Sequence, residues 1–448
     1  MDYSVLKHVL PQYKLHFKIT SIPMNTLKIF LLYVVFHFPI NQGLCQQIAD
    51  PGQWRQSAEY ETTKSVWMLY PQITHKRGYN NFDVQFEMMK AIVPTATINY
   101  IVQNDSIEQL VRAAIPSDWI SNQRIKFFHF PYQEFWARDF GPIFITNEKG
   151  EKAMADFMFN LWGYSDTSDV AAILDEKLDE RIAFNLKLPV LSSHVVSEGG
   201  NREINKQGVL LVVEKVERQR NPGLSLAQME AEYKRLLGAK KVIWLKQGVR
   251  DDDMSTMPPI SGPDGKKYYT MLTTNGHVDE FARFVNDSTI LLASVSPEDR
   301  TNDIEKQTGE RMDINFDILE KATDIQEHPF HIIRMPMPYI HTTTLSPADS
   351  VYKQIESLQI FNDNYFPSGN EINCVAAASY LNFVIINDRV LVAKYWQKGL
   401  SKKIKKRDEE AVKILQSAFP EKSIIQINAL SVNYGGGGMH CISMNEPF

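Results

Sequence analysis

The sequence predicts an α/β fold in which five units of the same kind are arranged in a ring. Segments of alternating apolar residues and segments of helical periodicity recur in one order, namely strand, tight turn, strand, helix and strand. This order is found five times, at a period of about 70 to 90 residues. A length of 448 residues would by itself suggest about three domains. The repeated order instead favours one circular arrangement of pseudo-fivefold ββαβ units.

The composition allows a large buried core and gives no sign of a highly charged partner. Apolar residues make up 44% of the chain and aromatic residues 11%, which is ample for such a core. The net charge is −5 and the two signs are interspersed. Nothing in this pattern indicates binding to nucleic acid or to an anionic membrane.

The N-terminal residues differ from the rest, and residues 1–45 are predicted to be a signal peptide. The apolar run at 27–36 is too short to span a bilayer, and Met24 shortly before it would be a more conventional start. Gly43 and Cys45 place small residues at the two positions that a signal peptidase recognises, which predicts cleavage near Cys45. The protein is therefore expected to be exported, either to the periplasm or out of the cell. An uncleaved membrane anchor and a lipoprotein anchor on Cys45 are the alternatives.

Cysteine usage agrees with this interpretation. If Cys45 leaves with the signal peptide, only Cys374 and Cys441 remain, which is too few for a disulfide framework. A free thiol in an exported protein is better explained by chemistry than by cross-linking.

The first two units are the least regular copies of the pattern. The opening unit has a strand at 65–70, a helix at 83–92, a strand at 97–102 and a helix that begins at Asp105. The second has strands at 142–145 and 153–159, a helix at 170–182 and a closing strand near Leu188.

The last three units each have a polar turn inside a hairpin. The third has strands at 201–205, 209–213 and 241–245, and a helix capped by Ser225 with Gln228 three residues on. The fourth has strands at 281–285, 289–293 and 331–335, and a helix at 312–322. The fifth has strands at 379–386, 389–393 and 423–428, and a helix at 408–418. The basic run at 402–407 is interpreted as a solvated turn ahead of that last helix.

Two polar insertions interrupt the pattern, at 251–270 and at 362–371. The first directly precedes the fourth unit. It is interpreted either as a lid over a site or as a disordered loop, and the lid is preferred.

Unusual polar residues stand at equivalent ends of the units. The segment from Trp136 to Asp139 comes just before the second hairpin, and Glu198 comes just before the third. His277 and Asp279 come before the fourth, Asn382 lies in the fifth, and Cys441 follows it. Equivalent ends of repeated units converge on the axis of a closed ring, so these side chains are expected to share one central pocket.

Several of these residues also have a purely structural explanation. Asp139 could be neutralised by its neighbour Arg138, and Glu198 by the nearby Arg202. His277 and the aspartate two residues later would point the same way on an extended segment, but such a pair also suits a surface turn.

Four consecutive glycines, Gly435–Gly438, stand just ahead of Cys441. Glycine supplies no side chain to a core and loses the most backbone entropy on folding, so this run suits a sharp bend or a close approach to a ligand. Taken alone, it is equally compatible with a hinge before a buried cysteine and with a loop that presents a nucleophilic thiol.

The candidate residues amount to one thiol, one imidazole and three carboxylates, which allows three chemical interpretations. The imidazole and carboxylates could bind a divalent metal, but a free thiol beside such a hard-oxygen site would be idle. A papain-like Cys–His pair explains the thiol and leaves the carboxylates without a role. The carboxylates gain a role if the substrate is a cation.

Four ordered motifs strongly resemble the agmatine deiminase family, which also contains the Porphyromonas-type peptidylarginine deiminases. They are Trp136-Ala137-Arg138-Asp139-Phe140-Gly141-Pro142, Glu198-Gly199-Gly200-Asn201, the segment from Asn275 to Phe284, and the segment from Gly435 to Ile442. The resemblance implies that residues 52–448 form a single deiminase catalytic domain. It also implies the five-bladed α/β propeller (pentein) fold of the guanidine-modifying superfamily, in agreement with the five units.

The resemblance further implies which residues act. Asp139 and Asp279 would hold the nitrogens of a guanidinium, and Cys441 would attack its central carbon. His277 would protonate the departing ammonia and then activate a water. Roles in substrate binding are implied for Trp136, Glu198, Asn382, Gly437 and Gly438. Neither a metal nor an organic cofactor is expected.

The implied reaction is hydrolytic deimination through a covalent cysteine thiouronium intermediate. Its substrate would be agmatine, which gives N-carbamoylputrescine, or peptidyl-arginine, which gives peptidyl-citrulline. The segment 156–163 is closer to the agmatine-type pattern, whereas export and the insertions favour the peptidylarginine branch. The substrate therefore stays open, and a catalytically silent exported protein that binds guanidinium or other cationic ligands is the alternative function.

Overall fold

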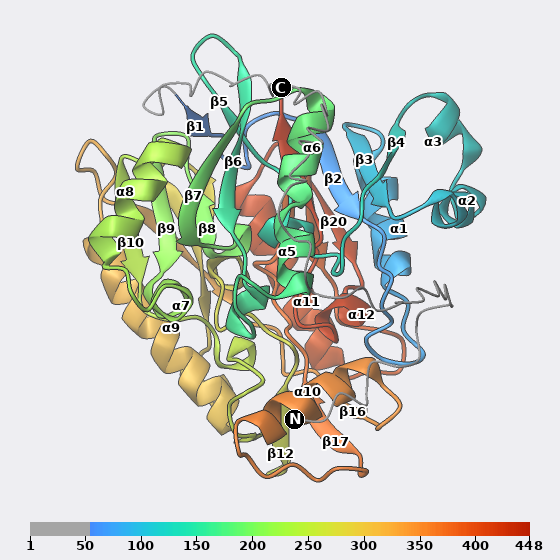
Figure 1. Ribbon diagram of the computed structural model, residues 1–448. Coiled ribbons are helices and arrows are strands. Elements are labelled where there is room, and N and C mark those ends of the chain that lie inside the picture. The colour runs from blue at the N-terminus through green and yellow to red at the C-terminus, as the bar shows by residue number, and fades with distance from the viewer. Residues whose placement is uncertain (1–53) are drawn as a thin grey trace, which may run out of the picture. The chain divides into compact units, whose positions relative to one another are not determined.

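The same three-stranded arrangement occurs in five separate sheets of the structure (Figure 1). In each, a central strand pairs antiparallel with one neighbour and parallel with the other. The structure is a computed structural model that describes residues 54–448, which fall in one compact unit, Ile48–Phe448. The predicted signal peptide at 1–45 and the alternative start at Met24 lie outside the described residues.

The first sheet joins distant parts of the chain. Its strands are, in order, β21 (Met444–Pro447), β2 (Thr63–Leu69), β3 (Thr97–Val102) and β4 (Ile125–His129). The central strand β2 pairs antiparallel with β21 and parallel with β3. The strand that directly follows the candidate nucleophile loop therefore closes the sheet that begins the fold.

The other four sheets follow the chain in order. The second contains β1 (Arg55–Gln56), β5 (Ile143–Thr146), β6 (Lys152–Met158) and β7 (Val190–Val196). The third contains β8 (Arg202–Ile204), β9 (Val209–Val213) and β10 (Lys241–Leu245). The fourth contains β13 (Ala282–Asn286), β14 (Thr289–Ser294) and β15 (His331–Pro336). The fifth contains β18 (Val384–Ile386), β19 (Arg389–Ala393) and β20 (Ser423–Ile427).

The central strands form the buried core because both of their faces are covered. Every residue of β9, for example, is fully buried, and its sequence is an unbroken apolar run. The helices that cover the sheets contact neighbouring units as well as their own. The α8 helix contacts β7, α9 contacts β10, α11 contacts β15, and α1 contacts β20.

The helices begin where the sequence supplies a cap. The α1 helix (Asn81–Ile92) and the α2 helix (Asp105–Ala114) are each capped by an asparagine side chain. The α8 helix (Leu226–Leu237) has the predicted capping box between Ser225 and Gln228, and it ends at Gly238 with φ of 66°. The remaining helices are α3 (Ser117–Ser121), α4 (Ala137–Phe140), α5 (Val170–Glu176), α6 (Leu178–Leu186), α7 (Glu214–Arg220), α9 (Asp303–Lys321), α10 (Ser350–Phe361), α11 (Lys402–Ala418) and α12 (Leu430–Asn433).

Most predicted elements are confirmed, and the bounds of three of them were wrong. The predicted helix at 170–182 is two helices, α5 and α6, which break at Lys177. The α9 helix begins at Asp303, nine residues before the predicted 312, because Asn302 caps it. The predicted strand 379–386 is shorter, since only Val384–Ile386 pairs with β19.

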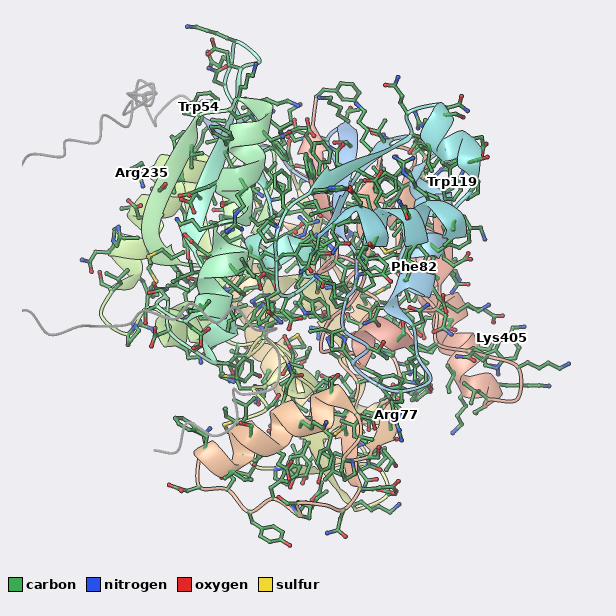
Figure 2. All side chains as sticks on the ribbon, turned by 45° about the vertical axis from the view of Figure 1, so that its right-hand side comes forward. Trp54, Arg77, Phe82, Trp119, Arg235 and Lys405 are labelled. Atoms are coloured by element: carbon green, nitrogen blue, oxygen red, sulfur yellow. The ribbon has the colours of Figure 1, made fainter. Side chains whose placement is uncertain are left out.

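The basic run at 402–407 is not a turn. Ser401 accepts a hydrogen bond from the backbone of Lys403 and begins α11 there, so the run forms the first turns of the helix. Its lysines at 402, 403, 405 and 406 are exposed, and Figure 2 shows Lys405 projecting outward. The run is therefore a solvated helix face.

The first polar insertion belongs to a sixth sheet that the sequence did not predict, and the second, at 362–371, leads directly into a strand of that sheet. Its strands are, in order, β11 (Ile260–Ser261), β12 (Lys267–Thr270), β17 (Ile372–Val375) and β16 (Thr342–Leu345). It lies with α10 at one end of the described unit (Figure 1). The disordered-loop interpretation of 251–270 was wrong, because β11 and β12 are paired and Asp252 is buried.

The α/β class is thus confirmed, and the circular arrangement stays a prediction. None of the six sheets formed by residues 54–448 closes on itself. Among the helices of that part of the chain, none is long and apolar enough to cross a membrane.

Candidate active site

The glycine run brings the backbone against the side chains around Cys441. A Cβ on Gly437 would lie 2.8 Å from the Trp136 ring and 3.0 Å from the Cys441 sulfur. A Cβ on Gly438 would lie 2.3 Å from Asn382 Oδ1. These distances are shorter than side-chain contacts allow, so only glycine lets the loop pack this closely. The run therefore shapes the surroundings of the thiol.

The Cys441 sulfur is buried and contacted by two donors. It accepts a hydrogen bond from the Gly438 backbone N–H at 3.3 Å and one from Asn382 Nδ2 at 3.2 Å. It also lies 3.8 Å from Asp279 Oδ2 and 3.7 Å from Glu280 Oε1. Burial, and then the nearby carboxylates, raise the pKa of this thiol well above its usual value. A cation bound beside the sulfur would offset both effects.

His277 lies between two carboxylates at a fully buried position. Its Nε2 is 3.3 Å from Glu198 Oε2, and its Nδ1 is 3.6 Å from Asp139 Oδ1. Burial lowers the pKa of this histidine, but Asp139 and Glu198 outweigh that effect and raise it to about 9. His277 is thus protonated at neutral pH when the site is empty, as a general acid must be.

Arg220 keeps Glu198 ionised in this buried environment. Its Nε donates to Glu198 Oε1 at 2.7 Å, and both side chains are fully buried. Burial raises the pKa of Glu198, but Arg220 and His277 together lower it to about 2. The alternative that Arg202 neutralises Glu198 was wrong, because Arg202 donates instead to the backbone oxygen of Ser197.

Asp139 is fixed by two donors from other segments of the chain. Its Oδ1 accepts from the Gly200 backbone N–H at 3.0 Å, and its Oδ2 accepts from the Trp162 indole at 2.7 Å. Trp162 has φ of 56°, a strained value for such a residue, which the bond to Asp139 helps to hold. Arg138 does not pair with this aspartate, since its salt bridge is with Glu59 at 3.6 Å.

Asp279 presents one occupied and one open carboxylate oxygen. Its Oδ2 accepts from Asn382 Nδ2 at 3.2 Å and contacts His440 Nδ1 at 2.7 Å. Its Oδ1 is buried without a hydrogen-bond partner among the described residues. The surface-turn interpretation of this segment was therefore wrong, because Asp279 is only 1% exposed.

Three of the predicted side chains converge on Gly200. A Cβ there would lie 2.6 Å from His277 Nδ1, 2.8 Å from Asp139 Oδ1 and 3.2 Å from Asp279 Oδ2. The structure thus brings together the predicted residues Cys441, His277, Asp139, Asp279, Glu198, Asn382, Trp136, Gly437 and Gly438.

Replacing Gly200 by alanine is expected to lower kcat/KM by about 100-fold, because the new methyl group would displace catalytic atoms by a fraction of an ångström or more. The matched control is Gly223→Ala, where a Cβ meets nothing within 4 Å. Steady-state ammonia release and thermal unfolding of both variants check this. Equal kcat/KM for the two folded variants would contradict the placement of Gly200.

Several residues around the site were not assigned a role from the sequence. His440 and Glu280 stood inside the quoted motifs but were given none, and Trp162 lies in the segment that was compared only for substrate type. Asp252 accepts from the backbone N–H of His277 at 3.0 Å, so the start of the first insertion braces that loop. The run of aspartates at 251–253, at the start of that insertion, was the signal in the sequence that this stretch belongs to the site.

Asp279, Glu280 and Cys441 also form a group that could hold a metal ion, since their donor atoms lie within 4.8 Å of one another. This set mixes one soft thiolate with two hard carboxylates and contains no histidine. The expectation that the reaction needs no metal stays a prediction.

A cleft of about 600 Å³ lies next to the side chains around Cys441, to which it is linked through Trp162. Trp162, which bonds Asp139, lines it together with Leu272, whose backbone lies against Gly436. The opposite wall is α10, through Lys353, Gln354, Ser357 and Leu358. Glu134 also lines the cleft, and burial raises the pKa of its carboxyl group to about 8. The α10 helix, which directly precedes the second insertion, thus contributes a wall of the cleft.

The sequence matches the model of the Porphyromonas-type peptidyl-arginine deiminase family over residues 55–258 and 264–447. The chain belongs to this family. This confirms the resemblance to agmatine deiminases and Porphyromonas-type deiminases, and it makes the protein a hydrolase that deiminates guanidino groups.

Relatives of known name agree with the family assignment. The agmatine deiminase of Pseudomonas aeruginosa (strain LESB58) is 24% identical over 401 residues, which are 88% of this chain and 95% of that protein. The solved structure of the Enterococcus faecalis agmatine deiminase is 25% identical with a TM-score of 0.67, over 89% of this chain and 97% of that one. A substrate-bound agmatine deiminase from C. jejuni shares the fold at 21% identity and a TM-score of 0.61, over 88% and 96% of the two chains.

Proposed function

We propose that this deiminase hydrolyses a small guanidinium compound of the agmatine type, with Cys441 as a covalent nucleophile. The observation that carries the proposal is the set of groups around one buried thiol. A histidine that is charged when the site is empty lies beside Asp139 and Glu198, and a carboxylate with an open oxygen lies beside the sulfur. A planar cation is the ligand that such carboxylates bind best.

The reaction begins when the guanidinium enters between Asp139 and Asp279. Its positive charge offsets the carboxylates that raise the pKa of Cys441, so the thiol releases its proton to solvent as the substrate binds and the thiolate forms in the complex. The thiolate attacks the central carbon and a C–S bond forms. His277 donates its proton to one nitrogen, the C–N bond breaks, and ammonia leaves. The product of this half-reaction is a thiouronium on Cys441.

The second half-reaction uses the neutral His277 that the first one leaves. His277 removes a proton from a water, which attacks the same carbon. The C–S bond breaks, the electron pair returns to the sulfur, and a neutral ureido product departs. The protonated histidine and the thiol site are restored for the next cycle.

The agmatine type of substrate is supported by the names of the relatives and by the cleft. The P. aeruginosa and E. faecalis proteins are named agmatine deiminases. The cleft also carries Glu134, a carboxyl group in no salt bridge among residues 54–448, and the terminal ammonium of such a molecule would favour its ionised form and pair with it.

The substrate is tested by comparing agmatine, free arginine, and peptides with internal or C-terminal arginine in an ammonia-release assay. The expected result is a kcat/KM for agmatine at least about tenfold above the others, because the distal amine adds a charge-assisted contact. A higher kcat/KM for any arginine peptide would contradict the agmatine assignment. Binding of agmatine without ammonia release would instead favour the alternative function, a catalytically silent binding protein. Loss of activity after addition of a metal chelator would favour a metal-dependent hydrolase.

We further propose that the five sheets that contain the shared three-stranded arrangement are the blades of one five-bladed propeller. The contacts of α8, α9, α11 and α1 with the closing strand of the preceding sheet support it, as does the contact between β21 and β5. These contacts link each sheet to two others. The ends of the sheets would then meet at the residues around Cys441.

A further inference from the structure

His440, next to the nucleophile in sequence, lies between two buried carboxylates. Its Nδ1 is 2.7 Å from Asp279 Oδ2, and its Nε2 is 2.5 Å from Glu59 Oε2. The ring is 1% exposed, so solvent does not supply other partners. Ionised carboxylates accept hydrogen bonds and do not donate them, so a ring that satisfies both must donate from both nitrogens. His440 thus lies behind Asp279 and bridges it to Glu59.

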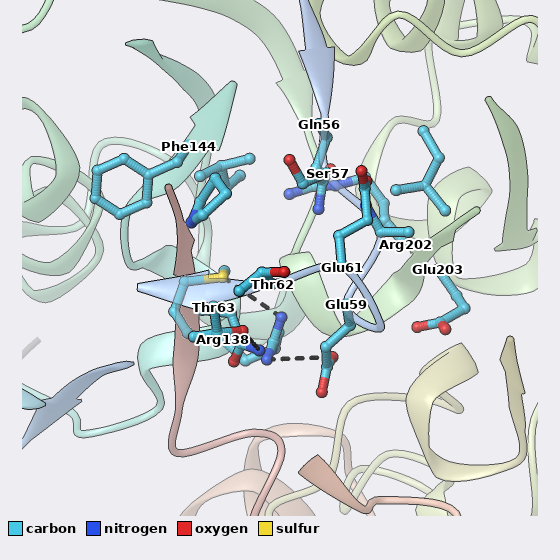
Figure 3. Close-up of a pocket in the computed structure, with 16 residues that line it drawn as sticks. Gln56, Ser57, Glu59, Glu61, Thr62, Thr63, Arg138, Phe144, Arg202 and Glu203 are labelled. Carbon is cyan, nitrogen blue, oxygen red and sulfur yellow. Dashed lines mark hydrogen bonds and ion pairs between the residues drawn. The ribbon is translucent and has the colours of Figure 1, made fainter. Parts of the chain in front are cut away.

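Glu59 is itself fixed from three further directions. Its Oε2 is 2.8 Å from Arg283 and 3.6 Å from Arg138, and its Oε1 accepts from the Ile385 backbone N–H at 2.8 Å. Burial raises the pKa of Glu59, but Arg283, His440 and Arg138 together hold it well below its usual range. Figure 3 shows Glu59 beside Arg138 at a cavity of about 40 Å³. Glu59 therefore remains ionised although it is buried.

The pKa of Asp279 is shifted in the opposite direction from the pKa values of its acidic neighbours Asp139 and Glu280. Burial raises the pKa of Asp139 and of Glu280, and among residues 54–448 no basic side chain lies within hydrogen-bond distance of Glu280. The pKa of Asp279 is instead lowered, because the hydrogen bond and charge of His440 outweigh burial. His440 also occupies Oδ2, so that Oδ1 is the oxygen left open.

We propose that His440, held in place by Glu59, is a positioning residue that fixes Asp279 for binding the guanidinium. It acts through Asp279 and touches neither the substrate nor the reacting atoms. This rests on the proposed deimination, in which Asp279 holds the substrate. The other charged or titratable groups that face Asp279 are Cys441, His277, Glu280, Asp139, Asp252 and Arg283.

The sign of the expected pH effect follows from the lowered pKa of Asp279. Asp279 is ionised at every pH above that value, and this is what lets it bind a cation. Without the charge of His440, its pKa would rise as the pKa values of Asp139 and Glu280 do. Substrate binding would then weaken first at low pH, so the acidic limb of the kcat/KM profile moves to higher pH.

The test compares His440→Gln and Glu59→Gln with the wild type and with Glu61→Gln. Glu61 is in the same segment but pairs with the exposed Arg55, so it is the matched control. At pH 6 we expect both test variants to raise KM at least about tenfold, with the increase shrinking toward pH 8, because a buried charge pair has lost a partner. Glu61→Gln should keep the wild-type KM and pH profile.

An unchanged acidic limb and KM in both test variants would overturn the proposal. The proposal would also be overturned if both variants lost activity equally at every pH, in proportion to the fraction of folded protein that thermal unfolding measures. A purely structural role would produce that result. If neither variant folds, ¹⁵N spectra of the wild-type imidazoles at neutral pH decide. Two protonated nitrogens on His440 support the proposal, and a single tautomer overturns it. A wild type that releases no ammonia from any guanidinium would instead count against the proposed function.

Discussion

Replacement of Cys441 by alanine is expected to lower kcat by at least about 10³-fold, because the covalent route needs the thiolate and no other nucleophile replaces it. The Sγ atom is the only side-chain group lost, so the surrounding carboxylates still bind the cation. The variant should therefore bind agmatine and release no measurable ammonia. Ammonia release and calorimetric binding of agmatine together check this.

The control for that variant is Cys374→Ala, the other free cysteine of the described residues. Cys374 is buried in β17 of the sixth sheet, where burial is the main cause that holds the pKa of its thiol far above the usual range. Its replacement should cost some stability through a small cavity and leave kcat near the wild-type value. A Cys441→Ala variant with the turnover of Cys374→Ala would contradict the nucleophile assignment.

Replacement of His277 by glutamine is expected to lower kcat by about 10²- to 10⁴-fold, because both half-reactions lose their proton carrier. Glutamine still fills the space between Asp139 and Glu198 but cannot transfer a proton. In the wild type, kcat/KM should fall above about pH 9, where a histidine whose pKa is raised to about 9 loses its proton. That basic limb should be absent from the residual activity of the variant.

Rate measurements from pH 6 to 10 on the wild type and His277→Gln check this assignment. Circular dichroism over the same range separates a proton-transfer effect from unfolding. A basic limb that persists unchanged in the variant would assign the titration to another group, and the general-acid role of His277 would fail.

Local pattern in the sequence was enough to predict the elements that pair with near neighbours. The strands Val209–Val213, Lys241–Leu245 and Arg389–Ala393 lie where apolar runs and flanking turns placed them. The pattern was misleading from Ser379 to Phe383, because this segment does not pair with β19 and its polar side chains bond to residues of the site. Ser379 bonds the backbone of Glu280, and Asn382 bonds Cys441.

Pairings between distant segments could not be predicted in this way. The strand β12 pairs with β17 about a hundred residues later, and β21 pairs with β2 at the other end of the described chain. Nothing in the local periodicity of either segment specifies its partner. The two insertions were accordingly interpreted apart, although the strands of the first and the strand that directly follows the second lie in one sheet.

The candidate site likewise contains features that the local sequence could predict and contacts between distant segments that it could not. The motifs were sufficient to single out the thiol, the imidazole and the carboxylates, since these residue types are rare in such positions. The partners that set their charge come from remote segments. His440 pairs with Glu59, 381 residues away, and Glu198 pairs with Arg220 from α7, a helix that the sequence did not predict.

The central claim is that Cys441 carries the substrate during turnover, and mass spectrometry after acid quenching tests it most directly. The enzyme is mixed with excess agmatine, quenched within the first turnovers, and digested to isolate the peptide that contains Cys441. The account predicts a mass increase equal to one thiouronium on that cysteine, absent from Cys441→Ala and from the Cys374 peptide. Full turnover with an unmodified Cys441 at every quench time would contradict it.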